Sequence, residues 1–160
     1  KSRLKPNTDR RISPTKEIGD IKMITKGIKQ LCTEAEEQIE TMTVEEVMAV
    51  QNDDDVVLVD IRDVRELWRD GTIPGAQHMP RGMLEFWVDP ESPYHREIFT
   101  TGKKFIFYCA GGLRSALAAK AVNDMGLAPV AHMRGGYGAW VKAEGPTIEK
   151  EAKLPEKKAD

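Results

Sequence analysis

One cysteine in this chain is surrounded by residues that can activate its sulfur. Residues 107–120 read FYCAGGLRSALAAK, so Cys109 ends an apolar run and directly precedes a glycine pair and Arg114. The glycines let the backbone curve tightly, so that N–H groups of residues 110–114 point inward. A helix predicted from Arg114 adds unpaired N–H groups and the positive end of its dipole. The pattern predicts a small anion-binding loop with a sulfur at its edge.

The same groups favour the reactive form of the cysteine. Helix N-termini and basic neighbours stabilise a thiolate, which is the nucleophile in cysteine chemistry. We therefore expect Cys109 to be ionised at neutral pH without a histidine base. None of the histidines is close to it in sequence, and we assign His78, His95 and His132 to turns or the surface. A cysteine that only fills the core next to a plain turn is the alternative, and the arginine and helix start argue against it.

Strands and helices alternate around this loop. Thr43 and Glu46 form a capping box, which predicts a short helix through Val50. Further helices are expected over Val64–Arg69 and over Arg114–Met125, the latter with Leu113, Leu117, Ala121, Val122 and Met125 along its apolar side. Apolar runs typical of buried parallel strands cover Val56–Val59, Lys104–Tyr108 and Pro129–Met133.

This alternation predicts an α/β fold with a mainly parallel central sheet. Sites in such folds lie beyond the carboxyl ends of the strands. Asp60 and Cys109 both stand at such an end. Their common position is the first indication of where the functional site lies.

The two ends of the chain are predicted to differ from this domain. Residues 21–42 are expected to form an N-terminal helical extension, in which Cys32 is a small buried apolar residue. Residues 1–20 are polar and basic, and residues 148–160 are rich in charge; both are expected to be flexible tails. The domain itself is expected over residues 43–147.

Composition sets the broad class. The 160 residues are 40% hydrophobic and 31% charged, with a formal net charge of -2, as in an ordinary globular protein. The charge balance gives no reason to expect nucleic acid as a partner, and no apolar run approaches the roughly 18 residues of a membrane span. The basic start lacks the apolar stretch of a secretory signal. Cys32 and Cys109 lie far apart and form no CxxC, so we expect a reducing, cytoplasmic setting.

On these residues, the chain resembles the rhodanese family of sulfurtransferases. The segment Tyr108–Ser115 is similar to the C-x-x-G-x-R-S loop of single-domain rhodaneses. Three further segments agree in order and spacing: Val59–Arg62 with Glu66 downstream, Ile73–Ala76 followed by Pro80, and Gly135–Trp140. Thr72 departs from the pattern, since the family commonly has histidine there. The resemblance implies a rhodanese-like three-layer domain.

The resemblance also implies a reaction. The Cys109 thiolate would attack the outer sulfur of a donor such as thiosulfate, release sulfite and hold the sulfur as a persulfide. A thiophilic acceptor, such as cyanide, a thiol or a protein cysteine, would then take it. Residues Ala110, Gly111, Gly112, Leu113, Arg114 and Ser115 would bind the anionic donor, while Asp60 and Arg62 would pair to support the neighbouring strand end. No metal or organic cofactor is required.

Two alternatives stay open at this level. Dual-specificity phosphatases with this fold place five residues between the cysteine and the arginine, whereas four separate Cys109 from Arg114 here. A phosphate needs the wider loop, so phosphatase activity is disfavoured. A rhodanese-like binding or sensing module is the second alternative, although inactive members usually lose the cysteine. The physiological donor and acceptor, the role of the extension and the oligomeric state do not follow from the sequence.

Overall fold

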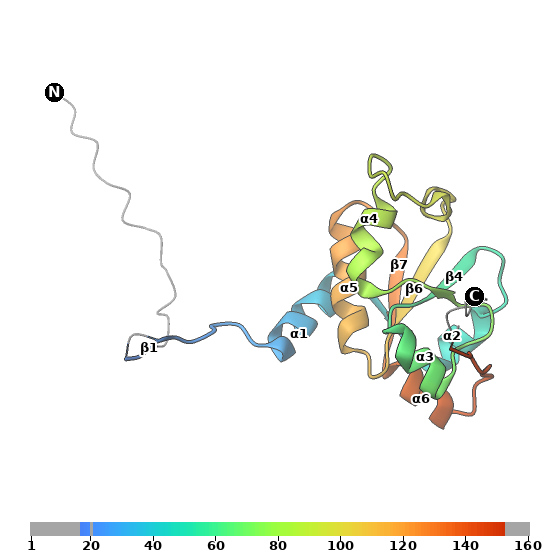
Figure 1. Ribbon diagram of the computed structural model, residues 1–160, viewed down its shortest axis with the longest axis horizontal. Coiled ribbons are helices and arrows are strands. Elements are labelled where there is room, and N and C mark those ends of the chain that lie inside the picture. Colours follow the sequence, from blue (N-terminus) through green and yellow to red (C-terminus); the bar gives the residue numbers. More distant parts are fainter. Residues whose placement is uncertain (1–16, 20, 153–160) are drawn as a thin grey trace, which may run out of the picture.

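The computed structural model describes residues 17–19 and 21–152 and is built around a five-stranded sheet (Figure 1). The strand order is β3-β7-β6-β4-β5, and every neighbouring pair in it is parallel. The α/β fold with a parallel sheet is therefore confirmed. The strands are β3 Glu40–Met42, β4 Val56–Asp60, β5 Gln77–His78, β6 Lys104–Tyr108 and β7 Val130–Met133.

Helices connect these strands and cover the sheet. The capping box at Thr43 is formed as predicted, and Asp63 with Glu66 forms a second one at the start of α3. The connection between β5 and β6 contains short helical turns. The helices are α1 Ile28–Gln38, α2 Val44–Val50, α3 Val64–Asp70, α4 Leu84–Val88, α5 Leu113–Asp124 and α6 Gly136–Lys142, with 3-10 turns η1 Arg81–Met83 and η2 Glu97–Thr100.

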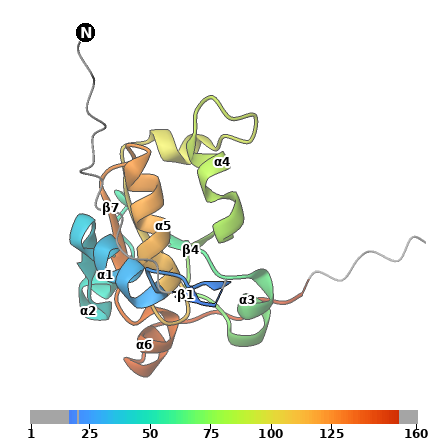
Figure 2. The same ribbon diagram turned by 90° about the vertical axis from the view of Figure 1, so that its left-hand side faces the viewer.

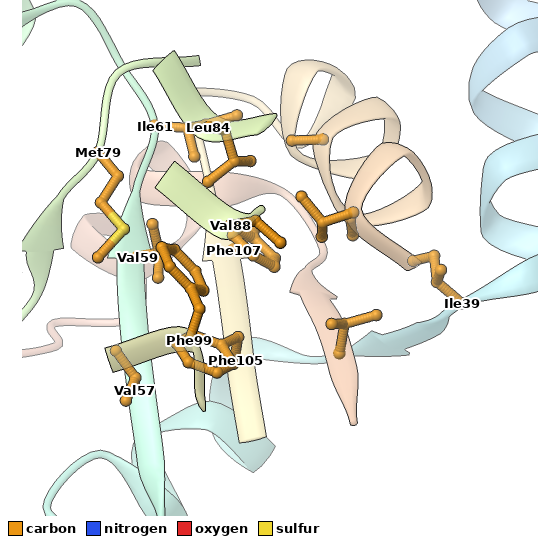
Figure 3. Close-up of a cluster of buried hydrophobic side chains, with 14 of the residues drawn as sticks. Ile39, Val57, Val59, Ile61, Met79, Leu84, Val88, Phe99, Phe105 and Phe107 are labelled. Carbon is orange, nitrogen blue, oxygen red and sulfur yellow. The ribbon is translucent and has the colours of Figure 1, made fainter. Parts of the chain in front are cut away.

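Alternate residues of the strands point to opposite faces and build two cores. On one face, Phe105 and Phe107 of β6 pack with side chains of β4, α4 and α5 (Figure 3). On the other, Ile106 and Tyr108 pack with side chains of α2 and α6, including the fully buried Trp140. The result is a three-layer domain in which Cys109 belongs to the first core and its neighbour Tyr108 to the second.

The buried side of α5 differs from the predicted one. Leu113 and Met125 are exposed at the two ends of the helix, and the buried residues are Ser115, Ala116, Ala118, Ala119 and Val122. Because these side chains are small, α5 approaches the sheet closely. The helix α1 packs against the outer side of α5 (Figure 2). The size of the side chain, rather than its hydrophobicity, therefore decides which side of α5 is buried.

The N-terminal extension is only partly helical, which corrects the prediction for residues 21–42. The helix α1 begins after Gly27, because the preceding residues form a two-residue strand β2 Ile21–Lys22 that pairs with β1 Glu17–Ile18. After α1 the chain forms β3, which pairs with β7 and is the edge strand of the main sheet. The sheet therefore starts before residue 43.

The start of the C-terminal tail also needs correction. Thr72 and Ile148 exchange two backbone hydrogen bonds of 2.9 Å, so the chain is still held to the domain at residue 148. The predictions for residues 1–16, 20 and 153–160 concern positions outside the described residues. Within residues 17–19 and 21–152, none of the helices combines the length and the apolar character needed to cross a bilayer.

Candidate active site

The sulfur of Cys109 lies at the carboxyl end of β6, enclosed by the start of α5. The backbone N–H groups of Gly112 and Ser115 donate to Sγ at 3.2 and 3.4 Å, and the Ser115 hydroxyl lies 3.6 Å from it. The cysteine is only 1% exposed. Two N–H donors directed at one sulfur stabilise negative charge there, as a thiolate or a persulfide requires.

The glycine pair has the conformational role that the sequence suggests, but at one position only. Gly112 is the N-cap of α5 and has φ +95°, a left-handed conformation that favours glycine. A Cβ atom there would lie 2.9 Å from the Gly135 backbone nitrogen. Gly111 is exposed, and a Cβ atom there would meet open space. The first glycine is thus dispensable for packing, and the second is required.

The loop is supported from behind by the start of α6. The N–H groups of Tyr137 and Gly138 donate to the carbonyl oxygens of Cys109 and Ala110, at 2.8 and 3.0 Å. This close approach needs glycine at 136, where a Cβ atom would lie 2.4 Å from the Cys109 carbonyl oxygen. The segment Gly135–Trp140, which the sequence analysis noted only as part of the family resemblance, therefore positions the backbone of Cys109.

Arg114 forms part of the rim of the loop and is held by Glu66 of α3. Its two terminal nitrogens each donate to one Glu66 oxygen at 2.9 Å. The guanidinium lowers the pKa of the Glu66 carboxyl, whose oxygen Oε2 also accepts the Asp63 N–H at the start of α3. Glu66 thus fixes the direction of Arg114 and offsets part of its charge. Sequence reasoning noted Glu66 only as part of a motif.

The outer rim of the loop is open to an approaching molecule. Ala110, Gly111, Leu113 and Arg114 are exposed, whereas Gly112 and Ser115 are buried beneath them. Of the six residues predicted to bind a donor, the structure therefore places four on the surface and two against the sulfur. A donor must approach Cys109 across the exposed four.

Asp60 and Arg62 form a buried ion pair on the opposite side of the sheet from Cys109. The guanidinium donates to both Asp60 oxygens, at distances of 2.7 to 3.2 Å, and to the Gly71 carbonyl oxygen at 2.7 Å. The Thr72 hydroxyl donates to Asp60 at 2.8 Å and lies 2.8 Å from the hydroxyl of Tyr108. Burial raises the pKa of Tyr108, which keeps its hydroxyl protonated. This network supports the strand ends and does not contact the sulfur.

His132 is the site residue that sequence reasoning placed wrongly. It lies on β7 with 1% of its surface exposed, not in a turn or on the surface. Its Nδ1 atom is 3.0 Å from the Ser115 hydroxyl, which itself contacts Cys109. The one indication in the sequence is the alternation of side chains along β7, which places His132 on the same sheet face as the buried Val130. The sequence does not show which helix covers that face.

No group of three or more His, Cys, Asp or Glu side chains within residues 17–19 and 21–152 is arranged to hold a metal ion. Both Cys32 and Cys109 are free thiols.

Comparison with known proteins identifies the family. The model of the rhodanese-like domain matches residues 43–143, which is most of the chain. A sulfurtransferase from Allochromatium vinosum is 32% identical over 61% of this chain and 83% of its own, and a putative sulfurtransferase from Bacillus subtilis is 30% identical over 63% and 85%. The chain therefore belongs to the rhodanese-like domain family, as its loop and motifs indicated.

A solved structure shares more of the sequence. A protein of unknown function from Rhodopseudomonas palustris, described as a possible tyrosine phosphatase, is 57% identical. It superposes with a TM-score of 0.78 and covers 81% of this chain and 100% of its own. Its similarity includes much of the chain outside the family match, so the two proteins share more than the rhodanese-like domain.

Proposed function

We propose that this protein is a sulfurtransferase that carries sulfane sulfur on Cys109, from thiosulfate or a similar anionic donor to a thiophilic acceptor. The best support comes from the two hydrogen bonds that the N–H groups of Gly112 and Ser115, at the start of α5, donate to the sulfur of Cys109. Membership of the rhodanese-like family and relatives named as sulfurtransferases support sulfur transfer in general. The identity of the sulfur donor and the persulfide on Cys109 are what we add to this general activity.

The reaction proceeds in two steps. The Cys109 thiolate attacks the outer sulfur of thiosulfate, the sulfur–sulfur bond of the donor breaks, and sulfite leaves with the bonding electron pair. The enzyme then holds a persulfide whose terminal sulfur is anionic, and an acceptor thiolate or cyanide removes that sulfur and restores the Cys109 thiolate. The N–H groups of Gly112 and Ser115 stabilise the charge on the attacking sulfur, while Arg114 attracts the donor.

The phosphatase alternative has weaker support. The Rhodopseudomonas palustris relative is described as a possible tyrosine phosphatase. In this chain Ala110–Leu113 is a short loop, and Arg114 already donates two hydrogen bonds to Glu66. An anion the size of phosphate would need a wider loop and an arginine free to bind it bidentately. A binding or sensing module without turnover is the other alternative, and the retained cysteine argues against it.

The cellular location and the partners that we propose rest on the same thiol chemistry. Cys32 and Cys109 are both unpaired, and a thiolate nucleophile needs a reducing environment, so we place the protein in the cytoplasm. The partners are a small anionic sulfur donor and a thiol or protein cysteine as acceptor. We expect no nucleic acid and no membrane among them.

Intact-protein mass before and after thiosulfate, with sulfite release measured in parallel, tests the proposal. The wild type and a Cys32→Ser variant should both gain the mass of one sulfur atom and lose it with cyanide, whereas Cys109→Ser should gain none. If Cys109→Ser also gains a sulfur atom, Cys109 is not the nucleophile. If the wild type gains no sulfur from thiosulfate or a protein persulfide but hydrolyses an aryl phosphate, the phosphatase reading replaces this one.

A further inference from the structure

A continuous line of polar side chains leads from the sulfur of Cys109 to the surface. The Ser115 hydroxyl lies 3.6 Å from Sγ and 3.0 Å from His132 Nδ1. The other ring nitrogen, Nε2, is buried and makes no aligned hydrogen bond among the described residues, but it lies 3.3 Å from Glu36 Oε1. Ser115 and His132 are buried, whereas the Glu36 side chain is 40% exposed.

The hydrogen atoms along this line can be arranged in one direction when Cys109 is a thiol. The S–H group then donates to the Ser115 oxygen, the Ser115 O–H donates to the Nδ1 lone pair, and Nε2–H lies near the Glu36 carboxylate. This arrangement needs a neutral imidazole protonated on Nε2. Burial lowers the pKa of His132, which keeps the imidazole neutral, so that Nδ1 is free to accept a hydrogen bond from the Ser115 O–H.

We propose that His132 is the proton acceptor for Cys109, reached through the Ser115 hydroxyl, and that Glu36 of α1 stabilises the imidazolium that forms. The S–H bond breaks and its electron pair stays on sulfur. The proton passes to the Ser115 oxygen while the Ser115 proton passes to Nδ1, so the net transfer is one proton from sulfur to Nδ1. Afterwards Nδ1–H donates to the Ser115 oxygen, and the Ser115 O–H donates to the thiolate. The two hydrogen bonds of the path are thus kept, each with its direction reversed.

The burial of the sulfur makes such a path useful. Cys109 is 1% exposed, so bulk water has little access to its proton. The path ends at a carboxylate that contacts solvent, which can return the proton to water. This inference rests on the proposed function, because it explains how the nucleophile of that reaction is ionised. It also replaces the expectation that Cys109 needs no histidine base.

The surroundings of His132 act on its protonation in both directions. Burial has the largest effect and, together with Arg134, which follows β7, opposes the imidazolium, whereas Glu36 faces the ring from α1 and stabilises it. Cys109 becomes anionic as His132 becomes cationic, so the pair is electrostatically coupled. The residues opposite His132 in the flanking strands, Thr41 on β3 and Phe107 on β6, carry no charge.

Glu36 lies outside the residues that match the family model, which begin at 43. It reaches the site because α1 packs against α5 (Figures 1 and 2). The inference therefore assigns a role in the chemistry to the N-terminal extension.

The rate of alkylation of Cys109 by iodoacetamide tests the relay without any sulfur donor. Modification is followed from pH 5 to 9 on the tryptic peptide Phe105–Arg114, which separates Cys109 from Cys32. His132→Asn keeps a group that can hydrogen-bond to Ser115 but cannot take up a proton. We expect the rate at pH 7 to fall roughly tenfold and the rate profile to move to higher pH. Glu36→Gln should slow the reaction by about threefold, since a partly exposed ion pair contributes little.

The controls separate a relay from a structural effect. Glu37→Gln changes a neighbouring exposed carboxylate of α1 and should leave the profile unchanged. Ser115→Ala interrupts the same path, so the Ser115→Ala/His132→Asn double variant should react no more slowly than Ser115→Ala alone. Independent, multiplying effects would overturn the relay, as would a His132→Asn rate within about twofold of wild type. If His132→Asn does not fold, the comparison of Glu36→Gln with Glu37→Gln decides.

The two proposals can fail separately. A shifted alkylation profile without sulfur uptake from thiosulfate would support the relay and reject the donor. Sulfur uptake with an unshifted profile would support the sulfurtransferase and reject the relay.

Discussion

Gly136 couples the Cys109 loop to the rest of the fold, and an alanine there should damage both stability and the reactivity of Cys109. The residue has φ +62°, and a Cβ atom would lie 2.4 Å from the Cys109 carbonyl oxygen and 2.7 Å from the Ala110 carbonyl. Nothing at these positions can give way easily, because both contacts are backbone atoms of the nucleophile's own loop. The loop and α6 must therefore separate in Gly136→Ala.

The expected cost can be estimated from the contacts. A left-handed conformation costs a residue with a Cβ atom about 1–2 kcal/mol. Separation also lengthens the hydrogen bonds from Tyr137 to Cys109 and from Gly138 to Ala110, each contributing about 0.5–1.5 kcal/mol. The free energy of unfolding should thus fall by roughly 2–5 kcal/mol, a large part of the 5–15 kcal/mol typical of a domain.

Gly75→Ala is the matched control. Gly75 has φ +79°, but a Cβ atom there would meet open space, so only the conformational cost of about 1–2 kcal/mol applies. Urea unfolding gives the free energy of unfolding of each variant. The alkylation rate of Cys109, measured without urea where both variants are folded, reports on the conformation of the Cys109 loop. Gly136→Ala should be the less stable variant and the only one with an altered rate. Equal costs and equal rates would show that the close approach of α6 does not position Cys109.

Three further outcomes follow from the electrostatics and hydrogen bonds of the site. Since Arg114 lowers the pKa of Glu66, Glu66→Gln should lose about 0.5–1 kcal/mol of stability at pH 7, and its difference from wild type in urea unfolding should shrink below about pH 4 as the carboxylate is protonated. Thr72→Val leaves Asp60 without one donor and should cost about 1–3 kcal/mol in thermal or urea unfolding, whereas Thr72→Ser should cost much less. Because burial lowers the pKa of His132, its imidazole binds a proton below about pH 6.5 in the unfolded chain but not in the folded chain. Stability should therefore fall from pH 7 to 5.5 in the wild type and fall less in His132→Asn, and an equal loss in both would contradict the burial effect.

The parts of the site that the sequence predicts are those encoded locally. The Cys109 loop is recognisable because a strand end, the glycine pair and a helix start follow one another directly in the chain. The capping box at Thr43 is equally local, and the structure contains it. The pairing of Asp60 with Arg62 needs only two residues of separation, and it too is present.

The parts that the sequence does not predict depend on contacts between distant elements. His132 reaches Cys109 only because β7 lies beside β6 and α5 crosses both, an arrangement set by strand order. The buried side of α5 was predicted wrongly for a similar reason: its alanines face the sheet, and its larger residues at 113 and 125 are exposed. The strand β3 was assigned to a helical extension because its three residues, Glu-Thr-Met, carry no strand pattern of their own.

Thr72 shows how a departure from a family pattern can be judged by its contacts. Sequence comparison alone leaves open whether threonine weakens the site, since the family commonly has histidine there. In the structure its hydroxyl joins Asp60 to the Tyr108 phenol, both of them buried. Tyr108 directly precedes Cys109, so this contact fixes the backbone at the nucleophile from the opposite face of the sheet. Threonine thus completes a support that is separate from the chemistry of the sulfur.

The nucleophile is consequently held from both faces of the sheet by different kinds of interaction. On one face, Thr72 and Tyr108 hold the end of β6 through buried hydroxyl groups, and α6 holds the loop carbonyls through backbone N–H groups. On the other, Ser115 contacts the sulfur itself and His132 contacts Ser115. Substitutions on the first face should therefore act mainly through stability and loop position, whereas those on the second should act on the ionisation of Cys109. The residues that we propose to act on the ionisation of the sulfur therefore lie on α5, β7 and α1, on the other side of the sheet from Thr72 and Tyr108.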